Sequence, residues 1–467
     1  VELEDKYELY QGGFIWDYID QFIVKEDRFG QEFLAYGGDF DDRPTDYNFC
    51  GNGIVYADRT PSPKAQEVKK LYQNLKLITD KKGVKVVNKN LFIDTSAYVL
   101  EYSLDFNGEK IYKNFMQVLV KAGDEKYIEL GLPEANIPGE YAVNIRFKLK
   151  EDALWGKAGH VVAFDQYIYS VEGIKAPEKL DKLTVIHGDI NIGVKNKDFS
   201  VLFSKQEGGI VSLRYAGKEM ITRTPMPIYW RSMTDNDKGN NHGFRCGQWL
   251  QASMFQRYCD FKLTEEDYKI IVEYTYLLPT TSETEVKVSY TTYANGEIKV
   301  SSYYKGVEGL PELPMFGMSF RLSADYDSFK WYGKGPEENY IDRLHGADLG
   351  IFEKSVVENV SKYAVPQESG NHTGVRWAQI KDKKGFGIEF IYEKDLFELG
   401  VSPYTAFELQ NALHHYELPN VNYTIVTIAA KQMGVGGDDS WGAPVHNEYL
   451  IDSSKDIYFE FIMRACK

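Results

Sequence analysis

Residues 97–120, AYVLEYSLDFNGEKIYKNFMQVLV, determine the fold class, because apolar and polar side chains alternate on both sides of a central Asn107-Gly108 pair. A period of two is typical of half-buried strands, and Asn-Gly is a strong signal for a two-residue hairpin turn. We therefore predict a hairpin with strands over 97–106 and 110–120.

The same pattern extends through residues 76–178, which we interpret as one immunoglobulin-like β-sandwich. About seven short strands in roughly 100 residues is the strand density of such a domain. Besides the hairpin, the expected strands are Val84–Val87, Tyr127–Leu130, Tyr141–Leu149 and Val161–Tyr169.

Residues 179–467 continue in the same style, with β-branched and aromatic runs between turn signals such as residues 206–209 (QEGG) and 294–296 (ANG). Helical periodicity is weak and confined to the stretch from about Cys246 to Cys259. We predict one large antiparallel β-sandwich here, so the whole chain is expected to be mainly β.

Residues 1–75 have a different pattern, which predicts a strand, a long loop and a helix. The expected strand is Gly12–Trp16, and the loop to about Pro61 is rich in Gly and Asp. Ser62 followed by Pro63 is a common helix start. These elements cannot bury a core alone, and the chain begins without Met, so we expect it to be part of a longer protein.

Composition and charge exclude several classes of function. The 467 residues carry 54 Lys and Arg against 69 Asp and Glu, a net charge of −15 that repels the phosphate backbone of nucleic acids. No apolar stretch approaches the ~20 residues that span a bilayer, so no membrane partner is expected. The four cysteines are scattered without CxxC spacing, which predicts neither a disulfide framework nor a zinc site.

Two candidate constellations lie in the first 60 residues. Trp16 and Asp17 end the predicted strand, and in a βα barrel the ends of strands form the active-site face. From spacing alone we favour Trp16 as a cap on a barrel core with Asp17 fixing a loop, and the alternative is that Trp16 is the floor of a sugar site. Residues 39–58 hold five Asp, which suit a hard cation, but acceptors of backbone hydrogen bonds are the favoured interpretation. The packed stretch 49–53 (FCGNG) presents Asn52.

Two more constellations lie further along the chain. Residues 234–239 (TDNDKG) are expected to form a turn. In residues 434–441 (GVGGDDSW), glycines lead to two acids and a Trp, and Trp441 is suited to stack on a sugar. Asp438 and Asp439 are alternatively an acid/base pair of a glycosidase, which we disfavour because adjacent side chains on a loop usually point apart.

Together these motifs resemble the C-terminal portion of glycoside hydrolase family 2 β-galactosidases, large bacterial enzymes of several domains. The matching stretches follow the family's order from end to end. They are residues 11–17 (QGGFIWD), 36–40 (YGGDF), 48–53 (NFCGNG) with 57–61 (ADRTP), 157–160 (KAGH), 230–231 (WR) with 234–237 (TDND), 335–343 (GPEENYIDR), 366–370 (PQESG) and 436–441 (GGDDSW).

The resemblance implies an architecture and a reaction. Residues 1–75 correspond to the end of a TIM (β/α)8 barrel, 76–178 to an immunoglobulin-like domain, and 179–467 to a large antiparallel β-sandwich of the galactose mutarotase-like kind. The reaction implied is retaining hydrolysis of β-galactosides, with one Glu as nucleophile and another as acid/base.

The resemblance also implies roles for individual residues. Trp16 matches the Trp at the bottom of the galactose pocket, and Asn52 matches an Asn that contacts galactose and a bound sodium ion. Phe49 matches a Phe whose backbone carbonyl ligates sodium and whose ring belongs to a mobile loop. Trp441 matches the Trp that stacks on incoming substrate at the aglycone side.

Departures from the family pattern limit what this chain is expected to do. In the family both catalytic Glu residues and the magnesium ligands precede the position of Gln11, so we expect this chain to lack them and to be inactive alone. Thr45 replaces an Asn of an outer magnesium site, and residues 231–233 read RSM where the family has Arg-Ala-Pro. The expected partners are a β-galactoside, the N-terminal part of the enzyme and further copies of the chain.

Two hypotheses from different classes follow. In the first, the chain is the C-terminal part of a β-galactosidase and supplies walls of the active site. In the second, it is a stand-alone carbohydrate-binding or structural module built from the two β domains.

Overall fold

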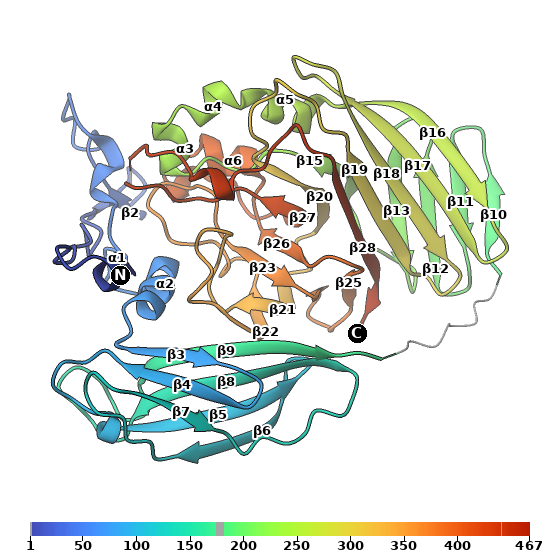
Figure 1. The fold of residues 1–467 in the computed structure, drawn as a ribbon. Helices are drawn as coiled ribbons and strands as arrows, with labels where there is room; N and C mark the ends of the chain where they lie inside the picture. Colours follow the sequence, from blue (N-terminus) through green and yellow to red (C-terminus); the bar gives the residue numbers. More distant parts are fainter. Residues whose placement is uncertain (1, 174–181, 440) are drawn as a thin grey trace.

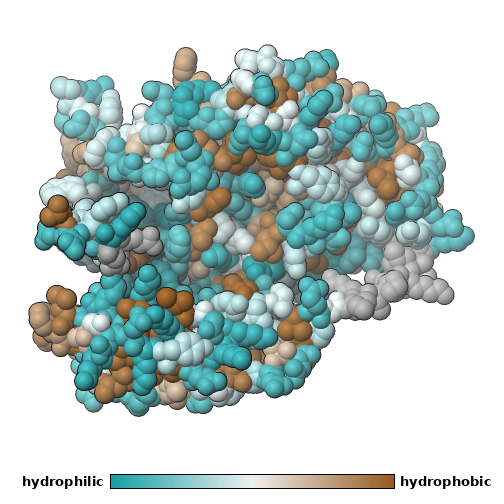
Figure 2. Space-filling view, in the orientation of Figure 1, coloured by the Kyte–Doolittle hydropathy of each residue, from teal (hydrophilic) through white to brown (hydrophobic). Residues whose placement is uncertain are grey.

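The computed structural model describes residues 2–173, 182–439 and 441–467 and is built mainly from antiparallel strands (Figure 1). The predicted fold class, mainly β, is thereby confirmed. The boundary expected between 178 and 179 lies outside the described residues. On the face in Figure 2, hydrophilic residues predominate and apolar side chains form small separate groups. Within the described ranges, no helix is long and apolar enough to cross a bilayer.

The first sandwich contains the hairpin that the sequence predicts. Its sheets are β3 (Leu75–Thr79), β4 (Gly83–Asn88) and β7 (Glu125–Glu129), and β6 (Glu109–Met116), β5 (Tyr98–Phe106), β8 (Gly139–Leu149) and β9 (Val161–Val171). Asn107 and Gly108 have positive φ (48° and 83°), which matches the twist of a hairpin. The strand after this turn ends at Met116, four residues earlier than predicted.

Three further sheets surround a second core. The first holds β10 (Thr184–His187), β11 (Asn191–Lys195), β12 (Phe199–Ser204), β13 (Gly209–Tyr215) and β14 (Lys218–Glu219). The second holds β15 (Arg223–Ile228), β20 (Met315–Ser323), β27 (Tyr423–Gln432), β26 (Phe397–Ser402) and β23 (Asn371–Val375). The third holds β16 (Arg257–Glu265), β17 (Lys269–Leu278), β18 (Thr284–Tyr293), β19 (Ile298–Tyr304), β28 (Ile457–Cys466), β25 (Gly387–Tyr392), β24 (Trp377–Lys381), β21 (Ser328–Gly335) and β22 (Asp348–Ser355). One continuous cluster of buried side chains joins the sheets, as a single large sandwich requires.

Short helices gather beside β15, β20 and β27 in the large sandwich (Figure 1). They are α3 (Asp235–Gly239), α4 (His242–Arg245), α5 (Gly247–Phe255) and α6 (Ala406–Asn411), with the single-turn segments η2 (Thr95–Ala97), η3 (His415–Glu417) and η4 (Asn447–Tyr449) elsewhere. The weak helical signal near Cys246 is confirmed as α5. Residues 234–239, expected to be a turn, instead form α3, because Thr234 and Asp237 make a reciprocal capping box.

The N-terminal segment contains α1 (Glu2–Lys6), β1 (Ile23–Glu26), β2 (Glu32–Ala35), η1 (Tyr47–Cys50) and α2 (Pro63–Leu71). The predicted helix after Ser62 is confirmed as α2. The predicted strand Gly12–Trp16 is wrong, since this stretch forms no strand in the structure. Backbone groups of a strand need a neighbouring strand, and no described strand pairs with this stretch. Phe14 and Trp16 are 103% and 82% exposed.

Helix α2 connects the two sandwiches (Figure 1). The Glu67 carboxylate accepts the N–H of Gly346 at 2.8 Å and contacts the His345 ring at 3.0 Å in the large sandwich. On the other side, Lys70 forms an ion pair of 2.9 Å with Asp165 of β9. The helix is therefore fixed to both domains.

The two sandwiches also contact each other directly through Glu140 of β8. Its carboxylate accepts hydrogen bonds from Arg376 at 2.6 and 2.9 Å and from the Tyr332 hydroxyl at 2.7 Å. The Glu140 and Arg376 side chains are only 19% and 12% exposed, so water does not replace these contacts easily.

We expect Glu140→Ala to lower the free energy of unfolding by roughly 2 kcal/mol, because it leaves a largely buried guanidinium without its carboxylate. Differential scanning calorimetry of the 467-residue chain measures this as a lower Tm. Glu134→Ala, an exposed position on the preceding loop, is the matched control and should leave Tm unchanged. Equal Tm values for the two variants would contradict the assignment of this contact.

Candidate functional site

The stretch that follows Trp16 runs beside residues 50–55. The Asp17 N–H donates to the Asn52 carbonyl at 3.3 Å, and the Ile54 N–H donates back to the Asp17 carbonyl at 3.2 Å. The Asp20 carboxylate accepts the Gly53 N–H at 2.7 Å. Burial raises the pKa of Asp20, although the Gly53 N–H offsets part of the shift. A Cβ at Gly53 would lie 2.2 Å from the Asp20 nitrogen, so the two backbones approach this closely only with glycine.

The Asp235 carboxylate fixes this loop to the large sandwich. Its Oδ1 accepts from the Asn48 amide and its Oδ2 from the Gln367 amide, both at 3.0 Å. The Asp235 N–H donates to the Gln367 side-chain oxygen at 3.2 Å. Because Asn48 precedes Phe49, this one carboxylate sets the position of the candidate aromatic residue.

The loop that carries Trp441 is held against α3. The Asn236 amide donates to the Asp439 carbonyl at 2.8 Å. Gly239 packs so tightly that an added Cβ would lie 2.0 Å from the Trp441 carbonyl oxygen. Asp235 and Asn236 are neighbours, so α3 positions both candidate loops at once.

The structure brings the predicted site residues into one region. The rings of Phe49 and Trp441 lie 5.4 Å apart at 48°, although the residues are far apart in sequence. They are 50% and 58% exposed, so each presents a face to solvent. Asn52 follows Phe49 on the same loop and bonds to Asp17, the neighbour of Trp16. Trp16 itself projects into solvent and packs on neither aromatic ring.

The Asn52 side chain offers a free acceptor at this place. Its Oδ1 atom is buried and accepts no hydrogen bond from the described residues. Buried polar atoms are normally paired. A cation, a water molecule or a ligand hydroxyl would each satisfy this oxygen.

Asp438 and Asp439 hold their own loop. Asp439 accepts the N–H groups of Ala443, Gly442 and Trp441 at 2.8, 2.9 and 3.0 Å, which lowers the pKa of its carboxyl. Asp438 pairs with His446 at 2.8 Å. These partners favour a structural interpretation of the acidic pair over acid/base chemistry.

The acids of the long N-terminal loop likewise accept hydrogen bonds. Asp42 accepts the N–H of Gly38 at 2.9 Å, and Asp39 accepts the N–H of Tyr36 at 2.9 Å. Asp39 also bonds to His414 at 2.9 Å, and the His414 ring stacks on Tyr36 at 4.8 Å. The interpretation as backbone acceptors is confirmed for these acids, and His414 anchors the loop to the large sandwich.

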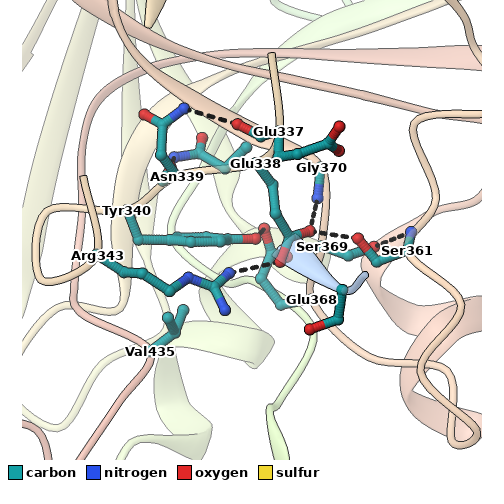
Figure 3. A network of polar contacts seen from close by, with 12 residues as sticks. Glu337, Glu338, Asn339, Tyr340, Arg343, Ser361, Glu368, Ser369, Gly370 and Val435 are labelled. Atoms are coloured by element: carbon teal, nitrogen blue, oxygen red, sulfur yellow. Dashed lines mark hydrogen bonds and ion pairs between the residues drawn. The ribbon is translucent and has the colours of Figure 1, made fainter. Parts of the chain in front are cut away.

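A network of polar contacts surrounds the carboxylate of Glu338 (Figure 3). Glu338 is 3% exposed. Its carboxylate accepts from Arg343 at 2.5 Å, from the Tyr363 and Ser361 hydroxyls at 2.7 Å each, and from the Gly370 N–H at 2.6 Å. These bonds shape the segment 361–370 that contains Gln367. The sequence identified this segment only through the family resemblance.

Two further carboxyls in this region have fewer donors, and of these Glu398 is buried and Glu368 is partly buried. Glu368 accepts from the Gln432 amide at 2.9 Å, and Glu398 accepts from the Asn371 amide at 2.8 Å. Burial raises the pKa of each to about 7. Each carboxyl is therefore protonated in the folded chain at mildly acidic pH.

A cavity of about 490 Å³ in the large sandwich borders this network, because Glu368, Ser369 and Gln432 are among its lining residues. It is lined by Trp230, Leu250, Met254 and Phe407 together with Arg321. Trp16, Phe49, Asn52 and Trp441 do not line this cavity. The candidate site is instead an open surface formed by loops.

Three family profiles match consecutive parts of the chain. Residues 1–77 match the family described as "Glycosyl hydrolases family 2, TIM barrel domain". Residues 84–170 match "Beta-galactosidase, domain 4", and residues 195–463 match "Beta galactosidase small chain".

Similar proteins cover nearly the whole chain. The β-galactosidase of Halalkalibacterium halodurans is 53% identical over 99% of this chain and 46% of its own length. The β-galactosidase small subunit of Latilactobacillus sakei is 37% identical over 60% of this chain and 97% of that subunit. Among solved structures, galactose 1-epimerase from Lactobacillus acidophilus NCFM is 9% identical, covers 62% of this chain and 99% of that one, and has a TM-score of 0.34. The chain spans about half the length of the Halalkalibacterium enzyme.

The raised pKa of the partly buried Glu368 predicts a pH dependence of stability. Its pKa rises from 4.5 in the unfolded chain to about 7, so its stabilisation is complete below pH 4.5 and is lost as pH rises through 7. We expect Glu368→Gln, which cannot ionise, to lose less stability than the wild type between about pH 5 and pH 8, by roughly 2–3 kcal/mol. Chemical unfolding at both pH values measures the difference.

Glu337→Gln is the matched control, because that neighbouring side chain is 44% exposed. Glu337 also pairs with Lys354 at 2.9 Å, so we expect its replacement to change the pH dependence by less than Glu368→Gln does. A Glu368→Gln chain that loses as much stability as the wild type would show that Glu368 is ionised throughout this range.

Proposed function

Because the chain belongs to the glycoside hydrolase family 2 β-galactosidases, we propose that it forms walls of the active site of a retaining β-galactosidase that hydrolyses terminal β-D-galactosides such as lactose. The two catalytic Glu residues would then belong to the N-terminal part of the enzyme. Under this proposal the chain has no turnover alone.

The Phe49–Trp441 contact is the observation that carries this proposal. It joins a loop from the part that matches the barrel profile to a loop from the part that matches the small-chain profile. Half-exposed aromatic rings offer apolar faces on which the C–H faces of a sugar pack. Trp441 then serves the aglycone side, and Trp16 serves as the floor of the galactose pocket.

The exposure of residues 12–16 supports the proposal that this chain assembles with an N-terminal part that carries the catalytic residues. Phe14 and Trp16 are almost fully exposed, which costs free energy for large apolar side chains. A barrel assembled from the upstream polypeptide would cover them and pair the backbone of Gly12–Trp16. In a retaining glycosidase the two catalytic carboxylates stand roughly 5–5.5 Å apart, and this chain's residues position the sugar and exclude water beside them.

A sodium ion fits the acceptor that Asn52 offers. Sodium is a hard cation that prefers oxygen ligands, and the Asn52 Oδ1 atom is buried without a partner among the described residues. The Phe49 backbone carbonyl and the Asn52 amide oxygen would hold it, and the ion would supply positive charge beside sugar hydroxyls. Magnesium of the whole enzyme would be held outside this chain.

We expect the purified chain to show no hydrolysis of a chromogenic β-galactoside and to gain activity when the N-terminal part is added. In that complemented enzyme, Trp441→Ala should lower kcat/KM about tenfold, which corresponds to an aromatic contact of roughly 1.4 kcal/mol. Trp155→Ala is the control, because Trp155 is 63% exposed in the other sandwich, and its kcat/KM should be unchanged.

Robust turnover by the chain alone would refute the proposal that the catalytic Glu residues lie outside it. Binding of galactose to the isolated chain, detected by isothermal titration and abolished by Trp441→Ala, would favour the carbohydrate-binding module instead. No heat of binding together with activity on complementation supports the enzyme proposal.

For the sodium site, we expect the activity of the complemented enzyme to rise with sodium chloride at constant ionic strength. Asn52→Ala should abolish this dependence, because it removes one of the two ligands that this chain supplies. The exposed variant Asn136→Ala should keep it. An unchanged sodium response in Asn52→Ala would refute the assignment.

A further inference from the structure

Three residues with metal-binding side chains converge at the junction of α4 and α5. His242 and Cys246 are 1% and 0% exposed. Glu312 reaches them from the segment before β20, with 17% of its side chain exposed. One ligand atom from each residue lies within 4.8 Å of the other two. The spacing of the cysteines in the sequence predicted no zinc site. Glu312 is remote in sequence from His242 and Cys246, and only the fold brings it to them.

The His242 ring is the second observation that points to a ligand. Neither of its ring nitrogens has a hydrogen-bond partner among the described residues, although the side chain is buried. An unpaired polar group in the interior costs roughly 1–3 kcal/mol. The ring stacks on Trp230 at 5.4 Å, which fixes its plane. An oriented imidazole with no partner is suited to bind a metal ion.

The surroundings of Glu312 hold its carboxylate in place. Its backbone carbonyl accepts the Trp249 indole N–H at 3.0 Å, and its Oε1 accepts from Arg245 at 2.5 Å. Metal-binding carboxylates usually carry such supporting hydrogen bonds. The pairing with Arg245 therefore orients the carboxylate, and its side-chain contact with the Cys246 thiol already brings two of the three candidate ligands together.

We propose that His242, Cys246 and Glu312 form a binding site for a zinc ion. Thiolate sulfur and imidazole nitrogen favour zinc over magnesium or calcium, and three protein ligands plus water complete a tetrahedron. The charges of a thiolate and a carboxylate balance the two charges of zinc, and the Cys246 proton is released to solvent on binding. Tetrahedral zinc keeps its ligand atoms roughly 3.5 Å apart, so small side-chain rotations would close the site.

The site would join the segment that follows α3 to a second segment of the large sandwich. His242 and Cys246 follow directly after α3, which holds the loops of Phe49 and Trp441. Glu312 belongs to a separate segment of the large sandwich. A bound ion would therefore stabilise the position of α3 through α4.

The test uses the 467-residue chain, stripped with a chelator and then loaded with zinc chloride and dialysed. We expect one equivalent of zinc by elemental analysis. Replacing a residue that only supports a ligand costs roughly 10–100-fold in affinity, so Cys246→Ser and Glu312→Gln should each weaken binding by about 100-fold or more. Cys259→Ser, at an exposed free cysteine, is the matched control and should bind as the wild type does.

Cobalt substitution in the unaltered chain gives a measurement that does not depend on how the variants fold. We expect a thiolate-to-cobalt charge-transfer band with one equivalent of cobalt. Absence of that band, binding of less than one equivalent of zinc by the wild type, or zinc retained in full by Cys246→Ser would each overturn the proposal. In that case Cys246 and Glu312 form an ordinary buried thiol–carboxylate contact.

Discussion

The arrangement of the loops depends on one buried charge, the Glu338 carboxylate. A carboxylate in the interior is stable only when its lone pairs are occupied, and here both oxygens accept hydrogen bonds from segments on either side. Segment 361–370 has no regular strand to hold it at this point. Its path is set by the need to satisfy Glu338 (Figure 3).

From this centre a series of polar contacts leads to the surface. Gln367 lies in the segment that Glu338 shapes, and it bonds to Asp235, which in turn bonds to Asn48. Asn48 precedes Phe49. The position of Phe49 and Trp441 therefore depends on a network whose central group, Glu338, is buried. The loops that carry these two rings are exposed, but the network restrains their movement.

The sequence predicted the sandwiches well because alternation and the Asn107-Gly108 turn are local signals, and local signals determine strands and hairpins. The strand at Gly12–Trp16 was wrong because a strand exists only with a partner, which local sequence does not reveal. Phe49 and Trp441 were predicted as site residues, and their roles remain predictions. Their contact, and the anchors Asp235 and His414, could not be predicted, since polar side chains in loops find partners through the tertiary fold.

Helix α2 is a mechanical link between the two sandwiches. Glu67 fastens it to the large sandwich and Lys70 fastens it to the small one, within one turn of helix. A displacement of the segment before α2 would therefore reach both sandwiches. Neither sandwich can rotate relative to the other without disturbing these contacts. A partner that binds the loops before α2 can therefore influence the relative position of the two sandwiches.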